Sequence, residues 1–203
     1  MKKYKDIYYL AKTVALDEDF LELRAILGTG RRNHTYQKLD YDDGPVFFEN
    51  GFKGEIPFFL SDIQFDGIYP VVSEKVASVI NDHQTHGLQL FPATIIGDDD
   101  QRHDGFYFFN FYAPVDCVDF EQSEIDMYEP NAKYNEVLRY KLRHEVLDLI
   151  PERHRLMIKL DRVQGGALIF HEKIVKALAR FDVKTLQFFK LSEYRRGMEY
   201  RSI

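Results

Sequence analysis

The sequence predicts an α+β fold in which mixed or antiparallel sheets carry two related strand–helix–strand units. The composition, 45% hydrophobic and 30% charged, is typical of a globular chain and not of a disordered one. Short apolar or alternating runs, which indicate strands, recur along the chain. A strand–helix–strand pattern near residue 70 returns 98 residues later. The 203 residues are expected to form a single domain, 1–203, with 65–100 and 163–192 as the related units.

The first quarter of the chain is predicted to form strands separated by turns. Residues 4–27 resemble strand pieces on both sides of an acidic turn. Further on, Asn50-Gly51 lies between the apolar runs 46–48 and 57–60. Asn-Gly between apolar runs is a turn signal, so both runs are predicted to be short strands.

The first strand–helix–strand unit begins at a strand over 68–72, where Pro70 favours a sheet edge or a strand start. Ser73 is a plausible helix N-cap whose hydroxyl would accept hydrogen bonds from first-turn amides. Gly87 ends the helix, and 88–96 is predicted to be the next strand. The apolar stripe of the helix follows helical spacing: Val76, Val79, Ile80 and His83.

After a polar turn at 97–105, the aromatic run 106–112 predicts a strand that is buried on both faces. Residues 131–150 are ambiguous between helix and strand. The remaining elements are predicted as a strand at 155–160, a turn at 164–166, a strand at 167–170, a helix at 171–181 and a strand at 185–190.

A shift of 98 residues aligns the two units without a gap. Glu74-Lys75, Leu88-Gln89 and Phe91 then match identical residues at 172–173, 186–187 and 189. We interpret the match as a duplicated unit whose helices pack on a shared sheet. The alternative is coincidence between two amphipathic helices with similar flanks.

Charge and cysteine content exclude several classes of protein. The net charge of −6 provides no basic footprint for nucleic acid. No window approaches the roughly 20 apolar residues that span a bilayer, and the first residues do not form a secretory signal. A single cysteine excludes an internal disulfide and fits a reducing compartment. The sequence therefore predicts a cytoplasmic protein without a nucleic-acid or membrane partner.

No motif for a metal, a cofactor or a catalytic residue is complete. His83 and His86 form an H-x-x-H pair, but the spacing of two histidines at a helix end is not sufficient for a metal site. The run 98–104 lacks the later ligands of a calcium loop, and 28–32 lacks the Gly-Lys-Ser part of a phosphate loop. Cys117 lies between two aspartates that would raise its pKa, so a buried structural thiol is predicted.

The most informative local feature is an acidic segment without Lys or Arg between His103 and Ala132. We interpret it as a surface for a cationic protein partner. The alternative is a solvated loop that the basic stretch 139–162 partly neutralises. With 17 Phe and 13 Tyr, some tyrosines are also expected to anchor an interface. The candidate partner-binding residues are Asp104, Asp116, Asp119, Glu121, Glu124, Asp126, Glu129, Tyr107, Tyr112 and Tyr128.

Four segments in a fixed order carry a resemblance to a known family. They are YPVVSEK at 69–75, GLQLFP at 87–92, the aromatic strand from 106, and VDCVDFEQSE at 115–124. In this order and spacing the chain resembles immunity family eleven, the bacterial immunity proteins encoded beside polymorphic toxins. Members commonly carry Trp after the second aspartate of the last segment, where this chain has Phe120.

The resemblance implies an α+β immunity protein that binds and neutralises a cognate toxin and is not an enzyme. It does not identify the toxin, and the sequence does not predict the oligomeric state. Two alternatives stay open: a small hydrolase or transferase that uses the acidic and histidine residues of 83–104, and a non-catalytic adaptor domain.

Overall fold

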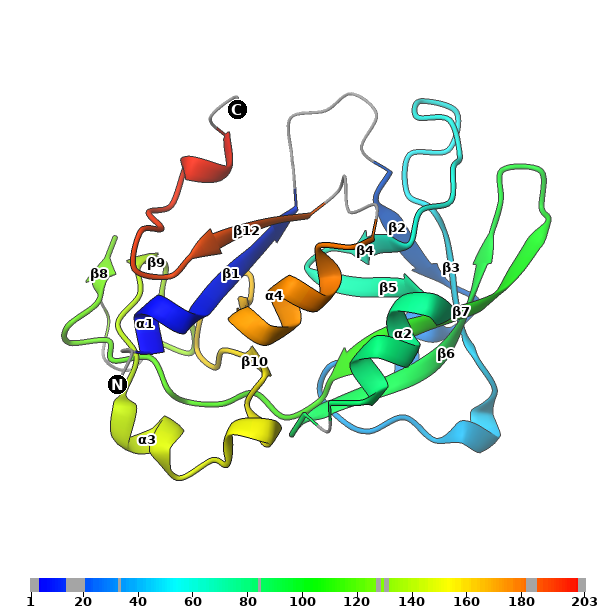
Figure 1. Ribbon diagram of the computed structural model, residues 1–203. Coiled ribbons are helices and arrows are strands. Elements are labelled where there is room, and N and C mark those ends of the chain that lie inside the picture. The colour runs from blue at the N-terminus through cyan, green and yellow to red at the C-terminus, as the bar shows by residue number, and fades with distance from the viewer. Residues whose placement is uncertain are drawn as a thin grey trace.

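The computed structural model describes residues 4–13, 21–32, 34–83, 85–126, 129, 132–181 and 186–200. Two main sheets, one of six strands and one of four, stand on either side of a pair of helices (Figure 1). A small two-stranded sheet lies beside the four-stranded one. The predicted α+β class is confirmed.

The six-stranded sheet has the order β2-β3-β6-β7-β5-β4. The pair β3 and β6 is parallel and the other neighbours are antiparallel, so the sheet is mixed. Its strands are β2 (Leu23–Ile26), β3 (Val46–Asn50), β4 (Ile63–Asp66), β5 (Tyr69–Ser73), β6 (Leu88–Ile96) and β7 (Arg102–Phe111).

The four-stranded sheet, β10-β11-β1-β12, is antiparallel throughout. Its strands are β1 (Tyr8–Thr13), β10 (Met157–Lys159), β11 (Leu168–His171) and β12 (Leu186–Lys190). The two-stranded sheet pairs β8 (Glu124–Ile125) with β9 (Val137–Arg139). The α-helices are α1 (Tyr4–Ile7), α2 (Glu74–Asn81), α3 (His144–Asp148) and α4 (Glu172–Leu178). The 3-10 helices are η1 (Thr29–Arg32), η2 (Tyr41–Asp43), η3 (Glu152–His154) and η4 (Met198–Tyr200).

The two similar segments have the same element order, β5-α2-β6 and β11-α4-β12. In each, the two strands run parallel and are separated by one antiparallel strand, which is β7 in the first case and β1 in the second. The prediction that the helices of both units pack on one shared sheet is wrong. The two units lie in different sheets, and in each a strand from outside the unit lies between its two strands. A common origin of the two units stays a prediction.

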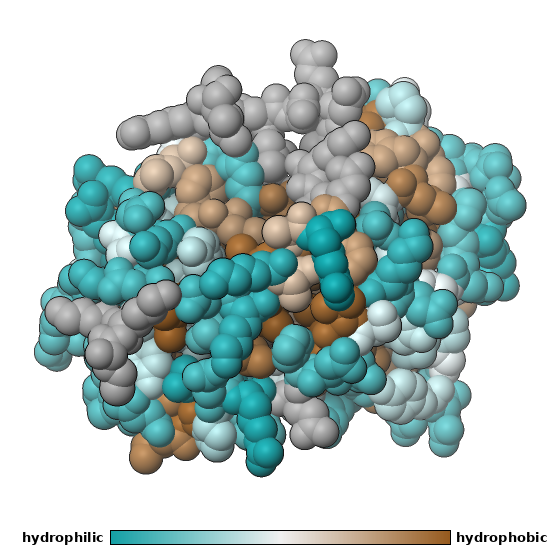
Figure 2. All heavy atoms as spheres, viewed as in Figure 1, coloured by the Kyte–Doolittle hydropathy of each residue, from teal (hydrophilic) through white to brown (hydrophobic). Residues whose placement is uncertain are grey.

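The helices α2 and α4 contact each other between the two sheets. Val76 and Ile80 of α2 and Ile174 and Leu178 of α4 are almost fully buried there, as their spacing predicts. The same apolar cluster takes residues from both main sheets. This shared core favours the predicted single domain, which itself stays a prediction. On the face in Figure 2, hydrophilic residues dominate, and hydrophobic ones are visible near the centre, along the upper part and at the lower left.

The strand β7 is buried on both faces, as the aromatic run predicts. Phe108 packs into a cluster on the outer face of the six-stranded sheet, whereas Phe109 and Phe111 belong to the cluster between the sheets. A third cluster lies around Tyr8, Cys117 and other residues of the four-stranded half. Burial of each large apolar side chain contributes about 1.5–3 kcal/mol to folding.

Several local predictions need correction. Ser73 occupies the N-cap position, but its hydroxyl donates to Asp62 Oδ1 at 2.6 Å and accepts no first-turn amide. Residues 57–60 are not a strand, since no neighbouring strand pairs with them. Part of 4–27 is helical, at α1. The ambiguous 131–150 contains both β9 and α3.

Candidate functional site

The acidic segment is fixed to the four-stranded half of the molecule by its apolar residues. Cys117, Val118 and Phe120 are buried in the cluster around Tyr8. The Arg143 N–H donates to the Cys117 carbonyl at 2.8 Å, and the Asp119 N–H donates to the Lys141 carbonyl at 2.9 Å. These contacts hold the backbone at 117–120, and further along the segment the Asp126 N–H donates to the Glu136 carbonyl at 3.1 Å.

Two of the candidate acidic residues form ion pairs with arginines. Asp116 Oδ1 lies 2.9 Å from Arg143, and Glu124 lies 2.7 Å from Arg195 and 3.6 Å from Arg139. Arg139 and Arg143 belong to the basic stretch that the alternative interpretation named. These pairs reduce the negative field of the segment, as that alternative expects.

The other acidic candidates divide into three groups. Asp119 holds a turn, because its Oδ1 accepts from the Gln122 N–H at 3.0 Å. Glu121, Asp126 and Glu129 are exposed, and no described residue forms an ion pair with them. Asp104 lies apart on β7, where it accepts from the Thr94 hydroxyl at 2.6 Å.

The two candidate tyrosines that the structure describes, Tyr107 and Tyr112, belong to different features of the six-stranded half. Tyr107 is partly buried against the core between the sheets. Tyr112 lines a groove, where the Lys38 Nζ atom lies 5.3 Å from the centre of its ring. Tyr128 lies outside the described residues. Whether any of these residues touches a partner stays a prediction.

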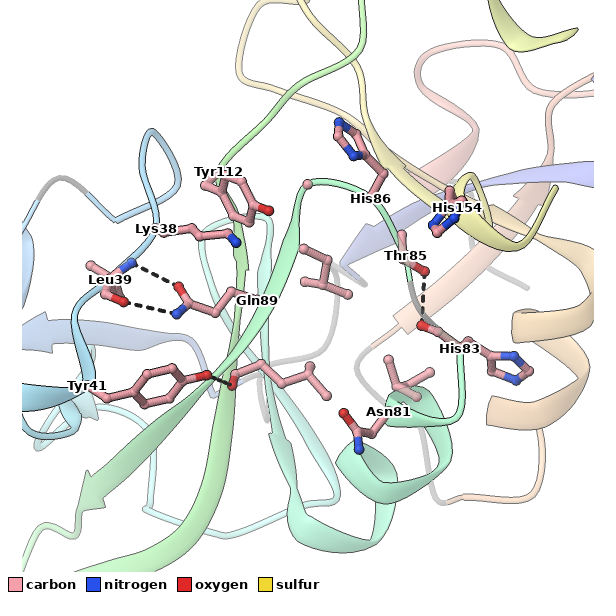
Figure 3. A pocket seen from close by; sticks show the side chains of 14 residues that line it. Lys38, Leu39, Tyr41, Asn81, His83, Thr85, His86, Gln89, Tyr112 and His154 are labelled. Carbon is pink, nitrogen blue, oxygen red and sulfur yellow. Dashed lines mark hydrogen bonds between the residues drawn. The ribbon is translucent and has the colours of Figure 1, made fainter. Parts of the chain in front are cut away.

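The groove next to Tyr112 has a volume of about 610 Å³ and opens between the loop 38–41 and the end of α2 (Figure 3). Gln89 fixes the loop, because its side-chain amide exchanges two hydrogen bonds with the backbone of Leu39, at 2.9 and 3.0 Å. Tyr41 stacks on Phe91, with 5.0 Å between the ring centres. One wall of the groove is therefore aromatic and cationic.

Histidines line the opposite wall of the groove. The rings of His83 and His86 point away from each other (Figure 3). The His86 N–H donates to the His154 carbonyl at 2.8 Å, so a backbone hydrogen bond joins these two residues. Within the described ranges, no three His, Cys, Asp or Glu side chains come together as metal ligands would.

The residues of the alternative enzyme hypothesis are separated by the length of β6. His83 and His86 precede this strand, whereas the aspartates at 98–100 follow its far end and His103 on β7 pairs with Ile95 near that end, about 25–30 Å away along the strand. Their polar groups serve local structure. Asp98 accepts from Asn50 Nδ2 at 3.3 Å, and the His103 ring stacks on Phe58 at 5.4 Å.

Two further candidates have structural roles. Cys117 is fully buried, and burial raises the pKa of its thiol to about 12, with the Asp116 charge as a smaller contribution. The structural-thiol prediction is confirmed, although burial rather than the aspartates is the main cause. Arg32 of the glycine-rich loop donates to the carbonyls of Gly44 and Pro45, each at 3.0 Å, so its guanidinium holds a loop.

Several residues that line the Tyr112 groove and a second depression around Lys159 carry no signal in the sequence. Tyr36 and Tyr41 are the most exposed of the described tyrosines, at 72% and 60%. Lys38 and Lys159 lie beside them in space. No periodic pattern marks these residues because they come from a loop and from the end of a short strand.

A family model identifies the chain. The model of the immunity protein family Imm11 matches residues 9–192. The chain belongs to this family. The match runs from β1 through β12 and therefore includes both main sheets and the acidic segment. It confirms the resemblance found in the sequence. No curated protein matches the chain.

Among the described residues, no helix is long and apolar enough to cross a membrane.

Proposed function

We propose that this Imm11 family member is a bacterial, cytoplasmic immunity protein that binds and neutralises a cognate toxin of a polymorphic toxin system. The observation that carries the proposal is the family match over 9–192. Inhibition by binding requires a complementary surface and no catalytic residue. The separation of the histidines and aspartates of 83–104 along β6 favours binding over the hydrolase or transferase alternative.

The acidic segment supplies part of the proposed interface. Its exposed carboxylates at Glu121 and Asp126 stand on a backbone fixed by buried neighbours, so their positions are set before binding. A cationic surface on the toxin would be attracted to them and would associate faster. A stable interface buries about 1,200–2,000 Å² in total, so residues beyond this segment must contribute.

The first experiment tests the function itself. The chain and the toxin-domain product of the adjacent gene are produced together, and complex formation is measured by size-exclusion chromatography. Growth of cells that express the toxin is measured with and without the chain. We expect a stable complex and restored growth. Growth that is restored without a complex, or no protection at all, contradicts neutralisation by binding.

The second experiment tests the acidic segment. Glu121→Lys with Asp126→Lys reverses two carboxylates that form no ion pair with described residues, and we expect association to slow about tenfold at low salt. The difference should shrink as salt rises, because the Debye length falls from about 10 Å at 0.1 M to about 3 Å at 1 M.

The matched control is Glu55→Lys with Asp82→Lys, which makes the same change in net charge at exposed positions of the six-stranded half. It should associate at nearly the wild-type rate. Equal slowing by both double variants would show that net charge matters and that the acidic segment has no special role.

A further inference from the structure

Lys159 is a cation at a position where the fold expects an apolar side chain. It is the last residue of β10, and residues two apart on a strand point to the same face. Met157, two residues earlier, is fully buried in the cluster between the sheets. Lys159 is itself only 9% exposed. Its ammonium group therefore lies at the rim of an apolar core.

The described partners of this ammonium group are all uncharged. Nζ donates to the Thr35 carbonyl at 2.8 Å and lies 4.9 and 5.2 Å from the ring centres of Tyr36 and Tyr69. No described carboxylate forms an ion pair with it. Burial lowers the pKa of Lys159, and the charge of nearby Asp161 opposes this only as a smaller contribution. Buried charges are normally paired.

The same lysine lines a depression of about 460 Å³ at the junction of the two sheets. Tyr36, Tyr69 and Tyr134 supply aromatic walls, and Lys133 adds a second ammonium group. The acidic lining residue is Asp161, whose Oδ1 accepts from the Arg162 backbone N–H at 2.9 Å. This pocket is therefore cationic and aromatic on a chain whose net charge is −6.

We propose that the Lys159 pocket binds a carboxylate side chain, Asp or Glu, that the partner protein inserts at the interface. The inference rests on the proposed function, since it names a chemical group on the partner. A lysine ammonium carries three donors, and the described structure uses one of them. An inserted carboxylate would accept the others and supply a counter-charge in direct contact, while the exposed Tyr36 and Tyr134 cover it from water.

The position of the pocket fits the proposed interface. Pro114, a residue of the acidic segment, lines the pocket, and Asp116 follows two residues later. Val115 also bridges to Leu160, next to Lys159. The cationic pocket thus adjoins the acidic segment at 114–115, so the complementary toxin surface would present a carboxylate on the same side as groups that match the segment.

The pocket is tested first on the chain alone, by NMR of the lysine ε-methylene groups during titration with sodium acetate. Sodium chloride at matched ionic strength is the reference. We expect the Lys159 signal to shift in a saturable way with acetate, and the exposed Lys75 to respond equally to both salts. Equal responses of Lys159 to acetate and chloride would overturn the proposal. A response to inorganic phosphate without one to acetate would overturn the carboxylate assignment.

The second test measures toxin affinity. Lys159→Met keeps an unbranched side chain up to the ε position and removes the ammonium group, and we expect affinity to fall about thirty-fold or more. Lys75→Met, at 78% side-chain exposure on α2, is the matched control and should bind as the wild type does. Thermal melts check that both variants fold, and if Lys159→Met does not fold, the acetate titration of the wild type decides.

The two proposals fail in different ways. If the wild type binds the toxin and Lys159→Met binds equally well, the pocket has no role and the immunity function stands. If the wild type does not bind the toxin, the proposed function fails. The acetate titration then still reports whether the pocket takes a carboxylate.

Discussion

Asn110 connects the loop that bears the exposed tyrosines to the central strand of the larger sheet. It is fully buried in β7. Its Oδ1 accepts from the Thr35 N–H at 2.5 Å, and its Nδ2 donates to the Gln37 carbonyl at 2.8 Å and to Gln89 Oε1 at 3.1 Å. The loop separates the Tyr112 groove from the Lys159 pocket, so Asn110 positions one wall of each.

Replacement of Asn110 by Leu, which has a similar size, should destabilise both the fold and this loop. All three hydrogen bonds are lost, and the Thr35 N–H and the Gln37 carbonyl keep no side-chain partner. A buried polar group without a partner costs about 1–3 kcal/mol. Because the loop can open and let water reach these groups, we expect the free energy of unfolding to fall by about 2–3 kcal/mol. For a chain of this size that lowers Tm by about 5–10 °C.

Urea unfolding measures the free energy, and hydrogen exchange of the amides at 34–39 measures the opening of the loop. Exchange should accelerate there and stay unchanged in β12, which lies in the other sheet. Gln37→Ala is the matched control, because Asn110 contacts only the backbone carbonyl of Gln37 and the side chain is exposed. Wild-type stability together with wild-type exchange in Asn110→Leu would refute the role given to this residue.

Two further predictions concern titrating groups. Burial raises the pKa of Tyr8 to about 12 from its usual value near 10, so its neutral form stabilises the fold below pH 10 and about 2.7 kcal/mol is lost as pH rises through 12. Tyr8→Phe should therefore show a smaller decline in urea midpoint between pH 9 and 12, and an equal decline contradicts the assignment. Cys117, with a pKa of about 12, should react with a thiol reagent at pH 8 only after unfolding in urea, so rapid reaction of the folded chain would disprove its burial.

Local sequence signals predicted the elements whose ends are marked by turn residues. Gly87 precedes β6, and the predicted bounds 88–96 agree with the observed strand. Gly87 has a φ of +75°, a conformation that favours glycine, and a Cβ at this position would lie 2.5 Å from the Ala113 carbonyl oxygen. The aromatic strand was equally predictable, because apolar residues at successive positions require burial on both faces.

Features that depend on distant partners could not be predicted from the sequence. The hydroxyl of Ser73 bonds to Asp62, eleven residues earlier, so the N-cap position was correct and the hydrogen bond was not. The two units lie in separate sheets. In each sheet a strand from outside the unit, β7 or β1, lies between the two strands of the unit, and no local pattern encodes this pairing. Lys159 shows the same limit, since its burial depends on Tyr36 and Tyr69, each from another part of the chain.

In the acidic segment, the negative charge counted from the sequence is larger than the negative field that the folded surface presents. Seven carboxylates without a nearby Lys or Arg in the sequence suggest a uniformly negative surface. In the fold, Asp116 and Glu124 pair with arginines, and the Lys159 pocket adjoins the same segment. The surface therefore carries both signs in a fixed arrangement. A partner that matches such a pattern must place each charge in register, and a partner with like charges at either position is repelled. In the proposed interface, discrimination among partners would therefore depend on the arrangement of the charges and not on their sum.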